Sequence, residues 1–391
     1  MVMAKAYLTP YGVGLGHASR LVTIANQLKL HNVSIRFSTY GEAVAYINLH
    51  GFECTKVPPV EFAWSNGGFS IKKSIGNVPI WLSNFARQLT RETRNIISFS
   101  PNLVISDSRL SPLVASRILG IPSIVILNQV KLLLSPTVRK FKVARMFENI
   151  NGEFLGILWD LSDKIIIPDL PPPNTISENN LSNAWSMKSK VEYVGFTIPK
   201  MPTDNQKMQS ILRMLGFSKD KPIVFMHISG PMETRFPLIE IIVDACKNIG
   251  SKIQYIISEG KPGGKIEPKK LSPFGWYYEW CPIKDEIFAI SDVVVIRGGH
   301  TAISQAIQYG KPMVTIPIQN HGEQLGNSEK IVRMGIGIKV EAYKLRYLDI
   351  VTAVNEILSN PRYQENAIRL KEITDKQQGF ENVIKIVRSY I

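Results

Sequence analysis

Short apolar runs rich in β-branched residues alternate with longer amphipathic stretches along most of the chain, and this alternation predicts an α/β fold with parallel strands. In the first half, strands are predicted at residues 4–9, 33–38, 102–106, 122–128, 164–168 and 191–195. The alternation stops at residues 195–206, which are rich in Pro, Gly and polar side chains and typical of an interdomain linker. It resumes with strands predicted at residues 222–228, 252–258, 293–297 and 313–317, and from about residue 342 the sequence is helical in character.

This organisation predicts two doubly wound, Rossmann-like domains, residues 1–198 and 199–365, that face each other across a cleft. In open parallel sheets, ligands bind beyond the carboxyl ends of the strands. Chemistry is therefore expected in the loops that follow the strands, at residues 10–19, 107–109, 229–235, 298–301 and 318–327.

Composition narrows the class of protein. The chain has 391 residues, of which 45% are hydrophobic and 20% charged, as expected of a globular protein with two cores. It has no apolar run of roughly 18 residues, so no spanning helix is predicted, and its N-terminus lacks the long apolar segment of a signal peptide. Cys54, Cys246 and Cys281 lie far apart without metal-ligand spacing, which predicts a cytoplasmic protein with no disulfide framework and no zinc site.

The charge of the chain bears on its partners. It has 46 Lys and Arg but only 32 Asp and Glu, which gives a net charge of +14. Such an excess favours an anionic partner, which can be nucleic acid, a phosphorylated ligand or an acidic membrane surface. The chain has no block of five consecutive basic residues, no arginine–glycine tract, no zinc finger and no RNA-binding aromatic motif. A nucleic-acid partner is therefore not expected.

The first candidate site is the loop at residues 11–20, YGVGLGHASR, which follows a predicted strand and opens a helix. Its glycines let the backbone approach a ligand closely, and the helix N-terminus offers free N–H groups to an anion. The spacing is G-x-G-x-G rather than G-x-G-x-x-G, and residues 37–40 bring no acidic ribose partner, which argues against NAD. His17 can take a proton from a hydroxyl near neutral pH, although a histidine at a helix start can equally serve as a local cap.

The second candidate site lies at the ends of two later strands. A buried apolar strand runs into Arg297, the Gly298–Gly299 turn and a helix start, which together offer positive charge and close backbone approach to a diphosphate. After the next strand, Glu323 stands beside Gln324, and Asn327 follows. A carboxylate next to a carboxamide is suited to neighbouring hydroxyl groups of a sugar.

These elements together resemble the donor-binding signature of GT-B glycosyltransferases, over residues 276–336. They are most similar to the UDP-dependent glycosyltransferases and to the N-acetylglucosaminyltransferase that makes lipid II. The stretch Arg297–Gln305 matches an R/H-x-G-x-x-x-x-x-E element, and Glu323–Asn327 matches a D/E-Q-x-x-N element. Trp280–Ile283 resembles the W-x-P-Q start of this signature, and Gly12–His17 resembles the G-x-G-H loop of the same enzymes.

The resemblance implies a UDP-sugar donor bound by the C-terminal domain and an acceptor bound by the N-terminal domain. His17 would be the general base, and Asp107, at the end of a predicted strand, would orient it. The residues implied in donor binding are Gly14, Gly16, Ser229, Gly230, Thr234, Trp280, Ile283, Arg297, Gly298, Gly299, His300, Thr301, Gln305, Glu323, Gln324 and Asn327.

Within this set, the residues 297–301 would hold the diphosphate, with the loop 229–235 closing over it. Gln305 stands where the family has a glutamate on the ribose, and Ile283 stands where it has a glutamine near the base. The pair Glu323–Gln324 would hold the donor sugar, and it comes about two residues later than in the family.

No Asp-x-Asp motif occurs in the chain, so we expect no carboxylate-held metal and no cofactor besides the UDP-sugar co-substrate. Arg297, helix dipoles and backbone amides would then meet the charge of the leaving group. A histidine base implies direct displacement at the anomeric carbon and hence inversion. Two alternatives stay open: a nucleotide-sugar 2-epimerase of the same fold, which needs acidic residues in the cleft, and a non-catalytic sugar-nucleotide-binding scaffold subunit.

Two stretches, residues 71–94 and 131–147, place basic side chains beside apolar ones, the combination that an anionic membrane surface attracts. Each stretch by itself is also explained as a core helix with a solvated basic face. Together with the resemblance, they predict an acceptor that is lipid-linked or a glycan, and peripheral association with the inner face of a membrane. The resemblance further implies that residues 366–391 form a C-terminal helix that packs back on the N-terminal domain.

Overall fold

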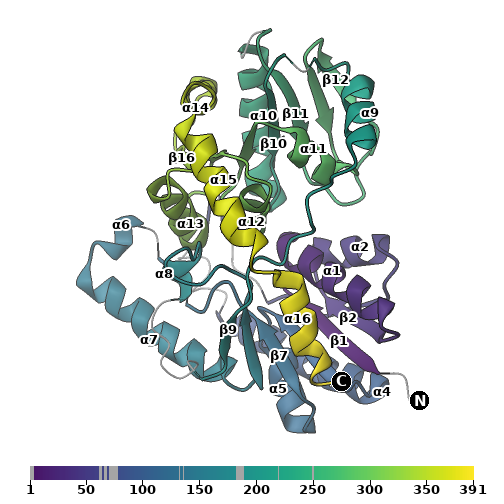
Figure 1. Cartoon of the computed structure of the whole chain (residues 1–391). Coiled ribbons are helices and arrows are strands. Elements are labelled where there is room, and N and C mark those ends of the chain that lie inside the picture. Colours follow the sequence, from purple (N-terminus) through teal and green to yellow (C-terminus); the bar gives the residue numbers. More distant parts are fainter. Residues whose placement is uncertain are drawn as a thin grey trace. The chain divides into compact units, whose positions relative to one another are not determined.

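The computed structural model describes residues 4–60, 64–65, 68–69, 78–131, 133–134, 136–181, 189–218, 220–248 and 251–391. The chain divides into two compact units, each built around a seven-stranded sheet (Figure 1). The first unit comprises Met1–Trp64, Phe69–Ile198 and Gln377–Ile391, and the second comprises Ser65–Gly68 and Pro199–Lys376.

The sheet of the first unit has the strand order β3-β2-β1-β6-β7-β8-β9, and all neighbouring strands in it are parallel. The strands are β1 (Lys5–Pro10), β2 (Ser34–Thr39), β3 (Cys54–Lys56), β6 (Leu103–Asp107), β7 (Ser123–Ile126), β8 (Lys164–Ile167) and β9 (Val191–Tyr193). The helices are α1 (Gly16–Leu30), α2 (Glu42–Leu49), α4 (Val78–Phe99), α5 (Ser111–Leu119), α6 (Pro136–Arg139), α7 (Lys142–Trp159), α8 (Glu178–Leu181) and α16 (Gly379–Arg388). The strands β4 (Trp64–Ser65) and β5 (Gly68–Phe69) pair separately.

Both faces of this sheet are covered by helices, and successive strand side chains enter different cores. In β1, Ala6 and Leu8 belong to the cluster that contains Leu21 of α1. Tyr7, between them, belongs to the cluster that contains Ile96 of α4. Because both faces are buried, strands such as β7 and β8 are nearly continuous apolar runs, and that is the pattern that predicted them.

The sheet of the second unit has the strand order β12-β13-β11-β10-β14-β15-β16, and only the β12–β13 pair is antiparallel. The strands are β10 (Ile223–His227), β11 (Gln254–Ser258), β12 (Lys269–Ser272), β13 (Gly275–Tyr278), β14 (Val293–Ile296), β15 (Met313–Thr315) and β16 (Gly337–Lys339). The helices are α9 (Asn205–Leu215), α10 (Met232–Asn248), α11 (Lys284–Ile290), α12 (His300–Gln308), α13 (Gly322–Arg333), α14 (Tyr347–Ser359) and α15 (Arg362–Asp375).

The ten predicted strands are all present, and none of their bounds differs from the predicted one by more than two residues. The prediction missed the strands β3, β12, β13 and β16 in the sheets. Each is three or four residues long. Such short strands carry no alternation of their own, and only pairing with a neighbour defines them.

The predicted domain boundary at residue 365 is wrong, because the second unit runs on to Lys376 and includes α15. Of the last two helices, α16 alone belongs to the first unit. Its residues Val383 and Val387 are fully buried there, in the core that also contains residues of α1. The start of α16 packs directly against the segment around Phe196, which leads out of the first unit. A Cβ at Gly379 would come within 2.1 Å of the carbonyl oxygen of Phe196.

The two predicted membrane stretches fare differently in the structure. Residues 71–77 of the first stretch lie outside the described residues, and the rest of it lies in α4. In the second stretch Lys131 is not a surface cation, since it is 5% exposed and burial lowers its pKa. Glu148, one residue beyond the stretch, accepts a hydrogen bond from Arg139 Nε at 3.0 Å. No helix among the described residues is long and apolar enough to cross a membrane.

Candidate active site

A histidine and an aspartate meet in the first unit at the carboxyl ends of two strands. His17 lies in the first turn of α1, directly after Gly16, and Asp107 is the last residue of β6. The strands β1 and β6 are adjacent and parallel, with Pro10 in register with Asp107, so both side chains arise at the same edge of the sheet. His17 Nδ1 lies 2.6 Å from Asp107 Oδ1.

The surroundings of Asp107 keep it ionised. Asp107 is fully buried, and burial by itself raises the pKa of a carboxyl group. The charges of Arg20 and His17, with hydrogen bonds from His17 and Ser108, outweigh burial and hold the pKa of Asp107 below its ordinary value of 3.8. Arg20 Nη1 donates to Asp107 Oδ2 at 3.1 Å. An ionised Asp107 accepts the Nδ1–H of His17, and this places the lone pair of the neutral imidazole on Nε2.

The glycine loop before His17 is closely packed on one side. A Cβ at Gly12 would lie 2.4 Å from both the ring and the carbonyl oxygen of Tyr40, so no larger residue fits there. Gly14 has a φ of +72° and no atom within 4 Å of where its Cβ would be. The ring of Tyr11 contacts the rings of His17 and Tyr40 edge-on, with centroids 5.7 Å apart in each pair. These contacts position the start of α1 and with it His17.

In the second unit, the loops after β10, β14 and β15 come together, because these three strands are adjacent and parallel. Arg297 follows β14 directly, and its Nη1 donates to the carbonyl oxygen of Thr234 at 3.0 Å, in the first turn of α10. The hydroxyl of Thr234 donates to the carbonyl oxygen of Pro231 at 3.0 Å, so this side chain is satisfied within its own turn.

Arg297 is a buried cation. It is 5% exposed, and its Nε has no hydrogen-bond partner among the described residues. Burial lowers the pKa of its guanidinium to about 10, so the side chain stays charged at neutral pH. A buried guanidinium with an unused N–H is stabilised by an anion within hydrogen-bond reach.

The turn after Arg297 has one crowded and one open glycine. Gly298 has a φ of +81°, and a Cβ there would lie 2.7 Å from Ser328 Oγ and 3.0 Å from the carbonyl oxygen of Gln324. Asn327 Nδ2 donates to the carbonyl oxygen of Gly298 at 3.2 Å, so α13 supports the turn. At Gly299 a Cβ would have no atom within 4 Å. The N-terminus of α12 is therefore accessible to a ligand on the Gly299 side.

The residues expected at the donor sugar lie at the start of α13. Gln324 Oε1 accepts from the backbone N–H of Ile318 at 2.9 Å, and Glu323 is partly exposed in the same helical turn. His321 caps this helix, with its Nδ1 accepting from the backbone N–H of Gln324 at 3.4 Å. Burial lowers the pKa of His321, and the charge of Arg297 acts in the same direction.

Gln305 is buried in a polar cluster with α11. Its Nε2 donates to Asp285 Oδ1 at 2.7 Å, and its Oε1 accepts from Lys284 Nζ at 2.8 Å. Burial alone would raise the pKa of Asp285, but the charge of Lys284 and hydrogen bonds from Gln305 and Lys284 hold it below the ordinary value. At the end of β10, burial lowers the pKa of His227 to about 3, and Lys284 adds to this effect. The cluster thus supplies a carboxylate next to Gln305.

The other predicted donor residues are distributed around the same strand ends. The partly exposed members of the predicted set in this unit are Ser229, Gly230, Trp280, Ile283, Gly299, Thr301, Glu323 and Gln324. The buried members are Thr234, Arg297, Gly298, His300, Gln305 and Asn327.

Sequence reasoning missed Arg20, Lys284, Asp285 and His321. Arg20 had a signal, because it stands three residues after His17 on a predicted helix and so shares its face. Lys284 and Asp285 had none, since their place beside Gln305 depends on how α11 packs near α12.

The described residues include no metal site. No three His, Cys, Asp or Glu side chains among them gather closely enough to hold a metal ion. Cys54, Cys246 and Cys281 are free thiols, and burial raises the pKa of Cys54 and Cys281 to about 12.

Comparison with known proteins adds to this geometry. Residues 223–382 match the sequence model of the family described as UDP-glucoronosyl and UDP-glucosyl transferase. An uncharacterized glycosyltransferase of Methanosarcina mazei is 25% identical over 374 residues, which cover 94% of this chain and 93% of the relative. The solved glycotransferase of kitacinnamycin aligns with a TM-score of 0.67 and 16% identity over 99% of both chains. The chain is a GT-B glycosyltransferase.

Other known proteins are similar to this glycosyltransferase over nearly its whole length or over about half of it. The spinosyn rhamnosyltransferase SpnG, solved with thymidine diphosphate, aligns with a TM-score of 0.66 and 16% identity over 99% of this chain and all of that one. A second relative, from Legionella pneumophila, is the UDP-N-acetylglucosamine–N-acetylmuramyl-(pentapeptide) pyrophosphoryl-undecaprenol N-acetylglucosamine transferase. It is 25% identical over 200 residues, or 49% of this chain and 54% of that protein. The matches are to enzymes, which favours catalysis over the scaffold alternative.

Proposed function

We propose that this glycosyltransferase moves a sugar from a UDP-sugar, of the UDP-N-acetylglucosamine or UDP-glucose type, to a hydroxyl or phosphate acceptor with inversion at the anomeric carbon. The donor is supported by the matched family and by the name of the Legionella pneumophila relative. The observation that carries the reaction is the 2.6 Å contact between His17 Nδ1 and Asp107 Oδ1.

His17 acts as the general base in this proposal. Its Nε2 takes the proton of the acceptor hydroxyl while the hydroxyl oxygen attacks the anomeric carbon. The bond between that carbon and the terminal phosphate oxygen of UDP breaks in the same step, so the configuration inverts. The buried carboxylate of Asp107 stabilises the imidazolium that forms and fixes the tautomer before the reaction.

The leaving diphosphate requires positive charge where its oxygen develops. Arg297 supplies a guanidinium, and the N-terminus of α12 behind Gly299 supplies free N–H groups with partial positive charge. The backbone at Ser229 and Gly230, directly after β10, is suited to the same oxygens. No metal ion takes part in this proposal.

The nucleoside and the sugar need different partners. Trp280 and Ile283 border the base, and Glu323 with Gln324 binds the sugar hydroxyls. We assign the ribose hydroxyls to Asp285, because Gln305 Nε2 donates to its Oδ1 at 2.7 Å and presents a carboxylate from the neighbouring helix. A carboxylate accepts from two vicinal hydroxyls at once.

Calorimetric titration without metal tests the donor site. UDP, GDP, dTDP and ADP are titrated into the wild type, into Arg297→Ala, and into Arg213→Ala, which removes an exposed arginine of the same unit. We expect selective micromolar binding of UDP that only Arg297→Ala abolishes. Preference for another nucleotide would contradict the UDP assignment, and equal binding in Arg297→Ala would contradict the diphosphate site.

The base is tested separately with His17→Ala and with His50→Ala, a control that removes an exposed histidine of the same unit. His17→Ala is expected to lose turnover while keeping its affinity for UDP, and His50→Ala should keep both. Proton NMR of the product reports the anomeric configuration, and retention would rule out the single displacement.

We propose further that the acceptor is lipid-linked and that α7 contacts an anionic membrane, which places the enzyme at the cytoplasmic face. One face of α7 is apolar and exposed: five side chains spaced three or four residues apart are 59–75% exposed, namely Val143, Met146, Ile150, Phe154 and Ile157. The helix begins beside exposed basic side chains, Lys140, Lys142 and Arg145. An apolar face next to cations matches the depth profile of an anionic bilayer surface.

Vesicle sedimentation tests this contact. The wild type should sediment with vesicles of phosphatidylglycerol and phosphatidylcholine and remain in the supernatant with phosphatidylcholine alone. Phe154→Glu should abolish sedimentation, whereas Ile118→Glu, which places the same charge at an exposed apolar position of α5, should not. Equal loss in both variants, or none in Phe154→Glu, would contradict the role of α7.

A further inference from the structure

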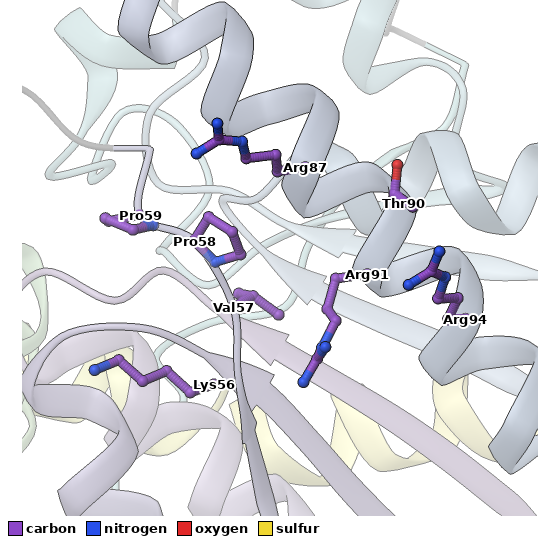
Figure 2. Close-up of a pocket in the computed structure, with 8 residues that line it drawn as sticks. All are labelled: Lys56, Val57, Pro58, Pro59, Arg87, Thr90, Arg91 and Arg94. Atoms are coloured by element: carbon purple, nitrogen blue, oxygen red, sulfur yellow. The ribbon is translucent and has the colours of Figure 1, made fainter.

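The first unit has a pocket of about 540 Å³ between α4 and the segment that follows β3. Figure 2 shows its eight lining residues, which are Lys56, Val57, Pro58, Pro59, Arg87, Thr90, Arg91 and Arg94. We propose that this pocket binds the phosphate or diphosphate group of an anionic acceptor. The inference rests on the proposed transferase function, since it names the chemical class of its acceptor.

Four of the eight lining residues are cationic, and none is acidic. No ion pair among the described residues involves Lys56, Arg87, Arg91 or Arg94. The one carboxylate in this part of α4, Glu92, is fully buried on the other side of the helix, where it pairs with Arg109. Among the residues that the structure describes, the positive charge of the pocket is therefore uncompensated by an ion pair.

This arrangement of charges opposes helix stability. Arg87 and Arg91 are four residues apart and Arg91 and Arg94 three, so like charges adjoin along one face of α4. Like charges at these spacings repel each other and destabilise a helix. An anion in the pocket would turn this repulsion into attraction. A phosphate fits best, because guanidinium groups donate parallel hydrogen bonds to two of its oxygens.

The pocket lies at the same edge of the sheet as His17. Lys56 ends β3, which is parallel to β2 with Thr39 in register with Lys56, and β2 is parallel to β1. The lining segment is anchored to α4, since Gln88 Nε2 donates to the carbonyl oxygen of Pro58 at 2.6 Å. The segment thereby forms the wall of the pocket opposite α4.

Aromatic side chains connect this wall to the candidate base. Tyr40 OH donates to the carbonyl oxygen of Val60 at 2.9 Å, and the ring of Tyr40 contacts Tyr11, which contacts His17. A group bound in the pocket is thus placed within the first unit on the side of His17. A phosphate-bearing acceptor can be held at its phosphate there while another part of it reaches the base.

Pyrophosphate binding is the first test, with the full-length chain and calorimetric titration. Because pyrophosphate also fits the donor site, the titration is made in Arg297→Ala as well as in the wild type. Arg91→Gln/Arg94→Gln should weaken pyrophosphate binding at least about tenfold in the Arg297→Ala background, where the donor site no longer contributes. The control Arg117→Gln/Lys385→Gln removes two exposed charges of the same unit and should leave binding unchanged. Equal loss in the control, or none in the pocket variant, would overturn the site.

Kinetics decides whether the bound phosphate is that of the acceptor. Once turnover is measurable, an acceptor with a phosphate group and the same acceptor without it are compared. Arg91→Gln/Arg94→Gln should raise KM for the phosphorylated acceptor roughly tenfold, with kcat and the affinity for UDP unchanged. An unchanged KM together with weakened pyrophosphate binding would show a site for a free anion and overturn the acceptor assignment. If the wild type does not bind UDP, the proposed donor is refuted. The pyrophosphate titration would still show whether the pocket binds an anion.

Discussion

His17 Nδ1 lies 2.6 Å from Asp107 Oδ1, although 90 residues separate the two in sequence, and Arg20 Nη1 lies 3.1 Å from the second oxygen of the same carboxylate. The aspartate therefore has two cation-forming partners, one on each oxygen. Arg20 offsets the cost of burying the charge, and this leaves the other oxygen to orient the imidazole. The two partners thus have separable effects on stability and on catalysis.

Replacing Asp107 with Asn should lower kcat by about 10²–10⁴-fold, because the amide no longer enforces the tautomer with a lone pair on Nε2. Donor affinity should stay within roughly twofold to threefold of the wild type, since the Asp107 carboxylate accepts its hydrogen bonds from His17, Arg20 and Ser108, outside the predicted donor set. Steady-state kinetics with UDP-sugar and calorimetry with UDP separate the two quantities. A kcat equal to that of the wild type would show that Asp107 has only a structural role.

The lowered pKa of Asp107 also predicts how stability depends on pH. The unfolded value is about 3.9, so the ionised carboxylate stabilises the fold above that pH, and this contribution is lost as the pH falls through the lower folded pKa. Urea unfolding midpoints of the wild type and Asp107→Asn are compared at neutral pH and near pH 3. The difference between the two proteins should shrink at low pH. A constant difference would contradict the direction of the shift.

His227 predicts a second, separate dependence at milder pH. Burial holds its folded pKa at about 3, far below the value of about 6.5 in the unfolded chain. The unfolded state binds the extra proton first, so the wild type should lose stability as the pH falls from about 6.5 toward 3. His227→Gln removes this proton linkage and should lose less between pH 7 and pH 5. If the urea midpoint shifts equally in the wild type and in His227→Gln, the proton linkage assigned to His227 is contradicted.

The sequence patterns were sufficient to predict the long helices and strands, and to place the candidate residues at the carboxyl ends of the strands. Fully buried strands such as Val293–Ile296 are apolar over their whole length, and polar residues at their ends mark the edge that binds ligands. This is why His17 and Arg297 could be selected from the pattern of one sequence, whereas Asp107 was added by the resemblance to related enzymes. The short strand Cys54–Lys56 has a polar, partly exposed pattern, and only its pairing with β2 makes it a strand.

What the sequence could not predict depends on packing between elements. Lys131 looked like a surface cation among basic residues, yet its aliphatic stem packs against Gly152 of α7 and is buried. The end of the second unit was misplaced for the same reason. Both α15 and α16 are amphipathic, so the pattern by itself does not say which core each helix packs on, and only the core that receives Val383 assigns α16 to the first unit.

Asp285 predicts a test of nucleoside recognition. If its carboxylate accepts from the ribose hydroxyls, Asp285→Asn should weaken UDP binding about fivefold to tenfold, because an amide accepts at only one atom. The 2′-deoxy nucleotide dUDP lacks one of these hydroxyls, so the same substitution should affect it less. Calorimetry with both nucleotides measures the ratio. An identical loss for UDP and dUDP would assign Asp285 to holding Gln305 and not to the ribose.

Substitutions at the two glycines after Arg297 should affect stability and ligand binding separately. Gly298 has a φ of +81°, and an added Cβ would stand 2.7 Å from Ser328 Oγ and 3.0 Å from the backbone of Gln324. Gly298→Ala should therefore lower the free energy of unfolding by about 1–3 kcal/mol, through backbone strain and contact with atoms that cannot all move. Ser328→Ala in the same chain should relieve only the part that comes from Ser328 Oγ.

Gly299→Ala is the matched control, because its Cβ would meet no atom within 4 Å and its φ of −67° suits any residue. Its stability should lie within about 1 kcal/mol of the wild type, the range of an N-cap change from glycine. If a diphosphate approaches the N-terminus of α12 as proposed, the new methyl group occupies part of that approach. UDP binding should then weaken at least about tenfold while the urea midpoint hardly moves. Unchanged UDP affinity in Gly299→Ala would show that the diphosphate does not bind at this turn. The buried charge of Arg297 would then have to be stabilised by an anion other than the diphosphate.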